Sequence, residues 1–270
     1  MTDLLADPDA HLAAPSRLGP AEHAALHRAP GAPWTAADLA LLDEAADLLD
    51  GPPGPAYGHV VVDEAQELTE MDWRAVMRRC PARSMTVVGD FAQAGPGSTV
   101  GGWADALGPH VGGRFTTRTL TINYRTTAEI LDGTRDLLAA IAPEQVLGRS
   151  LRHGEAPRVQ HTPAATLGGA LLDELRAQAE AHPGELVAVI AADATAARLA
   201  STAVAALARV VPVSAARGLE FDSVLVVSPE EIVAGRPSGR RDLYVVLTRA
   251  TRRVCVLDTA TRREISSSHR

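Results

Sequence analysis

The 270-residue chain contains no lysine, since all 26 of its basic residues are arginine. This absence excludes the phosphate-binding loop of the form G-x-x-x-x-G-K-[ST], whose lysine contacts the phosphates of a bound nucleotide. Aromatic residues make up only 3% of the chain, which limits stacking on nucleic-acid bases. The net charge of −7 excludes a uniformly basic nucleic-acid-binding protein, so any contact with nucleic acid must be confined to a local patch.

Cysteine and long apolar runs are also scarce. Cys80 and Cys255 lie far apart and have no metal-ligand spacing around them, which indicates a reducing compartment. The amino-terminal sequence lacks the basic start and continuous apolar core of a signal peptide. No apolar run is long enough for a membrane-spanning helix. We therefore expect a soluble, cytoplasmic protein without a membrane partner, and the hydrophobic content of 46% is enough for one large domain or two modest ones.

Apolar strands alternate with amphipathic helices along the chain, which predicts an α/β fold with parallel sheets. Strands are predicted at 59–63, 84–90, 118–125, 185–192, 210–214 and 221–229. Helices are predicted at 34–50, 70–79, 127–141, 171–181 and 194–208, and a helix followed by a strand at 241–258. A glycine-rich loop at 94–102, followed by Gly112 and Gly113, favours a domain boundary near 112–117.

The segment VVVDEAQ ends a predicted buried strand in two carboxylates, Asp63 and Glu64. Ligands of α/β folds bind at the carboxyl ends of parallel strands. Asp63 suits a magnesium ion held through water, and Glu64 is placed to orient and deprotonate an attacking water. The alternative is a strand-to-helix turn in which Asp63 is an ordinary helix cap.

Two further strand ends carry polar side chains. Gln93 follows a strand that ends in Gly89-Asp90, and its amide could contact a γ-phosphate or the attacking water. A plain Gly-Asp turn is the alternative. Arg125 in INYR suits bidentate contact with phosphate oxygens, and Tyr124 could stack on a base. Here the alternative is a salt-bridged surface arginine beside a core tyrosine.

The last two motifs flank a buried strand. In ARGLEFD, Gly218 permits close backbone approach and Glu220 can accept a hydrogen bond from a ribose hydroxyl, unless the segment is only a tight turn. In LYVVLTRA, Arg249 lies between an apolar helix and a strand and could stabilise developing negative charge. It could equally be an arginine that satisfies carbonyl groups at the end of a helix.

In this order and spacing, DEAQ, GDxxQ, NYR, GLEFD and LYVVLTRA resemble the later motifs of the UvrD/Rep-type superfamily 1 helicases. The resemblance covers roughly residues 57–258. It implies RecA-like parallel sheets in two lobes, an incomplete first lobe at 1–115 and a complete second lobe at 116–270. The Pro/Gly-rich loop that ends in Trp103 looks like the HelD-type proteins, which act on RNA polymerase. The implied partners are therefore DNA, RNA polymerase or both.

The resemblance implies ATP and Mg²⁺ as cofactors and gives each motif residue a role. The expected roles are magnesium ligand for Asp63, catalytic base for Glu64, γ-phosphate sensor for Gln93, adenine stacking for Tyr124, γ-phosphate contact for Arg125, phosphate and ribose contact for Gly218 and Glu220, and arginine finger for Arg249.

Three parts of that family are missing from the sequence. Nothing before Tyr57 supplies a phosphate loop, and the glycine-rich segment 95–102 follows the DEAQ strand and has no lysine. A large accessory domain and the HelD-type coiled coil are also absent. We therefore expect a chain that starts partway through the first lobe, is less stable there than in the second lobe, and needs a separate chain for hydrolysis. The alternative is a truncated, non-catalytic relative that acts as a binding module or has no selected role.

Overall fold

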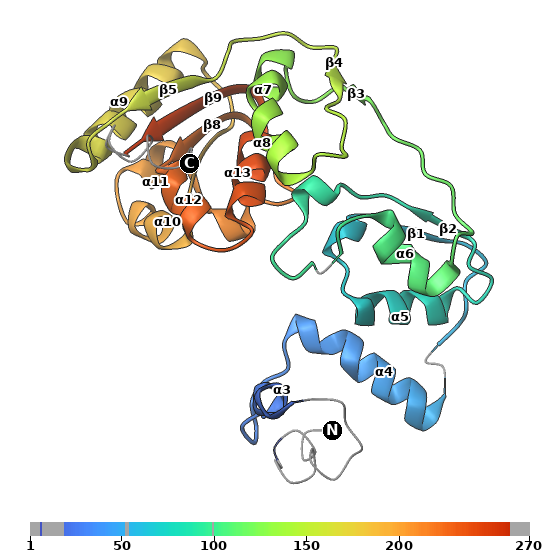
Figure 1. Ribbon diagram of the computed structural model, residues 1–270. Helices are drawn as coiled ribbons and strands as arrows, with labels where there is room; N and C mark the ends of the chain where they lie inside the picture. The colour runs from blue at the N-terminus through green and yellow to red at the C-terminus, as the bar shows by residue number, and fades with distance from the viewer. Residues whose placement is uncertain (1–5, 7–18, 52–53, 99, 260–270) are drawn as a thin grey trace. The chain divides into compact units, whose positions relative to one another are not determined.

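The computed structural model describes residues 6, 19–51, 54–98 and 100–259 (Figure 1). The chain divides into two compact units. The smaller unit comprises residues 1–58 and 70–82, and the larger unit comprises residues 59–69 and 83–270.

The smaller unit is helical. Its described elements are α3 (Pro20–Leu26), η1 (Ala36–Asp38), α4 (Leu39–Asp50) and α5 (Glu70–Arg79). A capping box starts η1, because the Asp38 carboxylate accepts from the Thr35 N–H at 2.7 Å. Gly51 ends α4 with a φ of 86°, a left-handed conformation that glycine adopts without steric cost. The helices predicted at 34–50 and 70–79 are thereby confirmed.

Ion pairs join α4 to α5. Arg74 and Arg78 of α5 both pair with Glu44, and Arg79 Nη2 lies 2.6 Å from Asp43 Oδ1. The hydrogen bond from Arg79, with a further one from Arg78, lowers the pKa of Asp43 to about 2. The contact between these two helices therefore depends on ionised carboxylates.

The larger unit contains, among its described residues, three parallel sheets. The first pairs β1 (Val60–Val62) with β2 (Met85–Val87), and the second pairs β3 (Ile122–Asn123) with β4 (Arg149–Ser150). The third has the strand order β5-β9-β8-β6-β7. Its strands are β5 (Arg158–His161), β6 (Val187–Ala191), β7 (Arg209–Pro212), β8 (Phe221–Val227) and β9 (Ala250–Asp258).

Helices connect these strands. In chain order they are η2 (Ala65–Glu67), η3 (Phe91–Gln93), α6 (Trp103–Val111), α7 (Ala128–Gly133), α8 (Arg135–Ile141), η4 (Ala164–Thr166), α9 (Leu167–Ala181), α10 (Asp193–Ala200), α11 (Val204–Leu207), η5 (Val213–Ala215), α12 (Pro229–Ala234) and α13 (Gly239–Leu247).

Helices cover both faces of the five-stranded sheet (Figure 1). Successive side chains of a strand point to opposite faces, so Val224 and Val226 of β8 join one apolar cluster while Leu225 and Val227 join the other. The first cluster includes residues of α7, α12 and α13, and the second includes residues of α9, α10 and α11. This arrangement explains the continuous apolar runs of the central strands and confirms the predicted RecA-like α/β fold with parallel sheets.

Some elements differ from their prediction. The strand predicted over 118–125 is limited to β3, and the helix predicted over 127–141 is interrupted at Thr134. The strands β4 and β5 and the helices α6 and α12 lie where no regular element was predicted. All four residues of β5 are exposed, so the strand has no apolar pattern to reveal it and is defined by its pairing with β9.

Close backbone contact joins α12 to α13. A Cβ atom on Gly239, the first residue of α13, would lie 2.6 Å from the carbonyl oxygen of Ile232 and would overlap that of Val233. Only glycine fits this position. Arg236 and Ser238, in the connection between the two helices, both donate to Asp242 of α13, at 2.6 and 3.0 Å.

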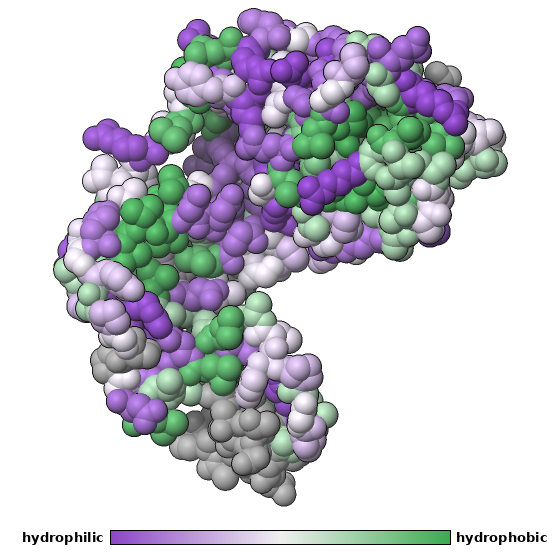
Figure 2. All heavy atoms as spheres, turned by 180° about the vertical axis from the view of Figure 1, so that it is seen from behind, coloured by the Kyte–Doolittle hydropathy of each residue, from purple (hydrophilic) through white to green (hydrophobic). Residues whose placement is uncertain are grey.

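Apolar side chains also reach the surface. Figure 2 shows green apolar patches separated by purple polar ones. Large exposed apolar side chains of the larger unit include Val61 of β1, which is 68% exposed, and Leu120 and Val146. None of the described helices is both long enough and apolar enough to span a lipid bilayer.

Candidate functional site

The two carboxylates of DEAQ stand at a strained turn directly after β1. Glu64 adopts a left-handed conformation with a φ of 51°, which is uncommon for a residue other than glycine. Its N–H donates to Asp63 Oδ1 at 2.8 Å. Glu64, not Asp63, is the N-cap residue of η2, so the helix-cap alternative for Asp63 does not apply. Both carboxylates are exposed and can reach a ligand.

Gln66 ties this turn to the end of β2. Its side chain is buried, with Nε2 donating to Glu64 Oε2 at 2.5 Å and Oε1 accepting from the Asp90 N–H at 2.9 Å. The approach leaves no room for a side chain at position 89, because a Cβ on Gly89 would lie 2.7 Å from Gln66 Oε1. The amide of Gln66 therefore fixes Glu64 relative to the Gly89-Asp90 turn.

Asp90 and Gln93 continue the network. Asp90 caps η3 by accepting from the Ala92 N–H at 3.0 Å, and it also accepts from Gln93 Nε2 at 2.8 Å and from Gln145 Nε2 at 2.7 Å. Because Nε2 of Gln93 is engaged by Asp90, the oxygen of the same amide faces the other way. That oxygen accepts from Arg249 Nη2 at 2.7 Å.

Arg249 is a buried cation that has no direct anionic hydrogen-bond partner among the described residues. It is 3% exposed, and its acceptors are uncharged oxygens of Gln93, Val245 and Leu219. Burial and the charge of Arg125 lower the pKa of Arg249 to about 10, while carboxylates nearby oppose that shift. Arg249 thus remains charged near neutral pH. Arg249 also donates to the carbonyl oxygen of Val245 at 3.2 Å, so it satisfies a carbonyl group near the end of α13, as the alternative for this residue predicted.

Arg125 forms the second cationic corner of the site. Its Nη1 lies 2.7 Å from Glu220 Oε1, and both side chains are partly exposed. Its Nε is buried and has no hydrogen-bond partner among the described residues. The backbone at this point is set by Asn123, whose Oδ1 accepts from the N–H groups of Arg125 and Thr126 at 2.8 and 2.9 Å. A buried N–H without an acceptor is costly, so Arg125 fits an anionic oxygen such as that of a phosphate.

The charges of Arg125, Glu64 and Glu220 all act on Arg249, and the guanidinium of Arg249 contacts the amide of Gln93. Arg249, whose hydrogen-bond acceptors among the described residues are uncharged, suits a polyanion, and a carboxylate at a strand end suits a water or a metal ion. The model of the viral superfamily 1 RNA helicase core domain matches residues 38–258. The chain belongs to this family. The superfamily predicted from the motifs of this helicase core is therefore confirmed, whereas its UvrD and HelD subgroups stay predictions.

Solved structures with a similar fold include a C-terminal domain of a possible DNA helicase from Lactobacillus plantarum WCFS1. It is 24% identical, with 51% of this chain and 89% of that chain covered and a TM-score of 0.41. The arterivirus nonstructural protein 10, a helicase, is 18% identical to this chain. The match covers 77% of this chain and 41% of that chain, with a TM-score of 0.46. No curated protein matches this helicase core.

The remaining predicted residues take positions that fit their expected roles without deciding them. Tyr124 is 71% exposed, so the core-tyrosine alternative does not apply. Gly218 has a φ of 72°, a left-handed conformation that favours glycine. Asp63 does not belong to any group of three or more potential metal ligands among the described residues. A single exposed carboxylate still fits Mg²⁺, which keeps several waters and takes much of its coordination from phosphates.

Two residues of this cluster were missed by sequence reasoning. Gln66 stands inside DEAQ, so its place in the motif was the available signal. Arg217 directly precedes Gly218, and an isolated arginine before a glycine carries no signal of its own. Its guanidinium nevertheless donates to the carbonyl oxygen of Gln93 at 3.1 Å and to Asp242 Oδ1 at 2.7 Å.

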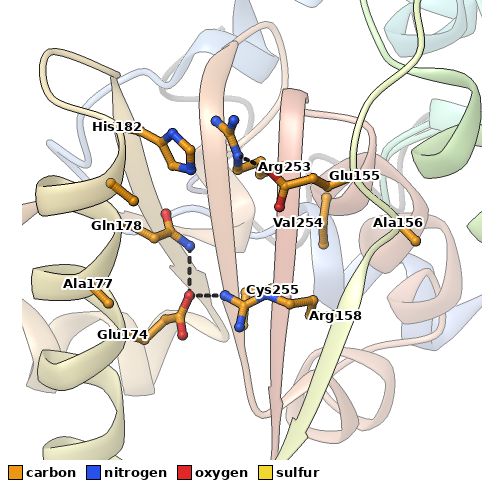
Figure 3. A pocket seen from close by; sticks show the side chains of 11 residues that line it. Glu155, Ala156, Arg158, Glu174, Ala177, Gln178, His182, Arg253, Val254 and Cys255 are labelled. Atoms are coloured by element: carbon orange, nitrogen blue, oxygen red, sulfur yellow. Dashed lines mark hydrogen bonds and ion pairs between the residues drawn. The ribbon is translucent and has the colours of Figure 1, made fainter.

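A pocket of about 190 Å³ lies elsewhere in the helicase core, between α9 and the strands β5 and β9 (Figure 3). Glu174 accepts there from Gln178 Nε2 at 3.0 Å and pairs with Arg158, while Glu155 accepts from Arg253 at 2.9 Å. None of the motif residues lines this pocket. The pocket and the cluster around Gln93 are therefore separate features.

Proposed function

We propose that this chain carries the hydrolytic residues of an ATP-dependent superfamily 1 motor that moves on nucleic acid. The contact between Arg249 and Gln93 is the observation that carries the proposal, because it joins a buried, unneutralised cation to an amide next to the DEAQ carboxylates. DNA is the proposed track, with RNA polymerase as a further partner if the HelD-type resemblance extends to function. The proposed lobes are residues 1–115 and 116–270.

Each motif residue has a proposed task in hydrolysis. Arg125 and Arg249 would neutralise charge on the γ-phosphate, and Gln93 would hold the attacking water or a γ-phosphate oxygen. Glu64 would accept a proton from that water as it attacks phosphorus and ADP leaves. Mg²⁺, when bound with ATP, would neutralise phosphate charge, and Asp63 would hold it through water. Tyr124 would stack on the adenine, with Gly218 and Glu220 at phosphate and ribose.

The chain supplies no lysine for the phosphate cradle, so we propose that a separate chain completes the site. Hydrolysis by this chain alone should then be negligible. The absence of lysine also favours a second candidate function, a non-catalytic binding module. The two candidates differ in whether the arginine cluster recognises a γ-phosphate.

Calorimetric titration with magnesium-ATP and magnesium-ADP separates these functions. The motor predicts that ATP binds about tenfold more tightly than ADP, and that Arg125→Ala removes this difference. Arg135→Ala is the matched control, because Arg135 is an exposed arginine that pairs with Asp132 on the surface. Equal affinities for ATP and ADP in the unaltered chain would overturn the motor and support the binding module.

A further inference from the structure

We infer that Arg217 is a positioning residue, which fixes the Gln93 amide in the orientation needed to contact a γ-phosphate or its attacking water. The inference rests on the proposed function for the identity of the ligand. It rests on geometry alone for the claim that Arg217 orients Gln93. Arg217 itself lies outside the groups proposed to touch the nucleotide.

The guanidinium of Arg217 contacts the segment around Gln93 at several points. Its Nε donates to the carbonyl oxygen of Gln93 at 3.1 Å, and its Nη2 lies 3.5 Å from the carbonyl oxygen of Ala94. The same Nε lies 3.4 Å from Glu67 Oε1, and that oxygen accepts from the Gly95 N–H at 2.9 Å. Arg217 therefore fixes the main chain at Gln93 and at Ala94, the residue that follows it.

The other end of this contact is rigid. Arg217 Nη2 donates to Asp242 Oδ1 at 2.7 Å, and the side chain of Asp242 is fully buried. The second oxygen of Asp242 accepts from Arg236 and Ser238. A buried carboxylate with all these donors has little freedom to move. Arg217 thus transmits the position of α13 to the backbone of Gln93.

Gln93 is consequently held at each of its polar groups. Its main-chain oxygen accepts from Arg217, its side-chain nitrogen donates to Asp90, and its side-chain oxygen accepts from Arg249. Two of these contacts orient the amide, and the contact with Arg217 fixes the main chain that carries it, which avoids the loss of rate that follows when a contacting group is misplaced by about 1 Å. Lysine cannot replace Arg217, since a single ammonium group lacks the planar fork that reaches Asp242 and two carbonyl oxygens together.

A matched variant of Arg236, the other arginine that binds Asp242, distinguishes the positioning role of Arg217 from a merely structural one. Arg217→Ala and Arg236→Ala each remove one arginine from Asp242, but Arg217 alone of the two contacts Gln93. Both variants should lower the unfolding temperature. The ratio of the ATP and ADP affinities should fall about tenfold in Arg217→Ala and stay unchanged in Arg236→Ala. Arg217→Lys, which keeps the charge, should fold more readily and still lose most of the ratio.

A readout that needs no nucleotide is the side-chain amide signal of Gln93 in ¹⁵N NMR spectra, assigned through Gln93→Ala. We expect Arg217→Ala and Arg217→Lys to shift or broaden this signal, and Arg236→Ala to leave it in place. Equal effects of the Arg217 and Arg236 variants on the signal and on the ratio would overturn the positioning role. If the unaltered chain does not distinguish ATP from ADP, the proposed function fails, while the NMR comparison still decides whether Arg217 orients Gln93.

Discussion

Arg249 Nη2 lies 2.7 Å from Gln93 Oε1, and the two residues are separated by 156 positions in the sequence. The partner of this buried guanidinium is a neutral amide, so the hydrogen bond orients the cation without cancelling its charge. A carboxylate at the same place would have formed a closed ion pair. The arrangement leaves Arg249 able to attract an anion, which is the property that charge stabilisation in phosphoryl transfer requires.

The first prediction concerns this contact. Gln93→Ala should lower the free energy of unfolding by about 1–3 kcal/mol, because it leaves the buried Arg249 with one acceptor fewer. Urea unfolding provides the measurement. Gln145→Ala is the matched control, since it removes another amide from Asp90 but does not touch Arg249, and it should cost less. A larger loss in Gln145→Ala than in Gln93→Ala would contradict the importance given to the Arg249 contact.

The second prediction concerns the Gly89 turn. Gly89→Ala should destabilise the protein and weaken nucleotide binding, because its Cβ would displace the Gln66 amide that connects Glu64 to Asp90. Gly168→Ala is the opposite case, since nothing lies within 4 Å of its Cβ and the residue belongs to α9. The Gly168→Ala substitution should raise the free energy of unfolding by up to about 1 kcal/mol. Thermal unfolding of the two variants gives both signs in one experiment.

The third prediction is a pH dependence caused by Tyr244. Burial and the charge of Asp90 raise the pKa of this phenol to about 12, above the ordinary value of 10.0. The folded state therefore binds the proton more tightly, and this contribution to stability is present below pH 10 and lost as the pH rises to about 12. At about pH 11 the loss should amount to about 1.4 kcal/mol.

Tyr244→Phe, which has no phenolic proton, serves as the comparison. Urea unfolding should show that, between about pH 8 and pH 11, the unaltered chain loses about that amount of stability relative to Tyr244→Phe. A difference that does not change with pH would show that Tyr244 is not held as the neutral phenol. Arg249 titrates in the opposite sense and is present in both chains.

The fourth prediction concerns acid and the smaller unit. The lowered pKa of Asp43 means that its contribution to stability is present above about pH 4 and is lost as the pH falls to about 2. The protection of the α4 and α5 amides against hydrogen exchange, relative to the intrinsic exchange rate, should therefore fall over this range. In Asp43→Asn the exchange should be fast already near neutral pH. The control is Asp173→Asn, a substitution at an exposed position of α9, which should leave the hydrogen exchange of α4 and α5 unchanged.

Apolar runs predicted the buried strands well, because β6 and residues 224–227 of β8 are covered on both faces and are apolar at every position. The carboxyl ends of β1 and β2 also explain why Glu64 and Gln93 lie in one network, whereas Arg249 comes from the turn that precedes β9 of another sheet. Exposed strands could not be found in this way, since β5 depends on its pairing with β9 for its structure. The boundary near 115 stays a prediction.

Other features of the site depend on contacts between distant parts of the chain, which a single sequence does not display. The buried amide of Gln66 reaches across 24 positions to Asp90, and the arginine fork of Arg217 reaches across 124 positions to Gln93. Neither residue type has a periodicity or a spacing that would reveal such a role. Sequence patterns located the ends of the network, and the structure supplied the residues that hold those ends together.

Gly239, which begins α13, and Gly168 of α9 should differ in how many substitutions they tolerate during evolution. Any side chain at position 239 would collide with the carbonyl groups that end α12, so no drift at this position is possible without moving a helix that leads to Arg249. Gly168, by contrast, is open to substitution. A library of random variants selected for function should therefore retain Gly239 in every survivor and show many residues at position 168.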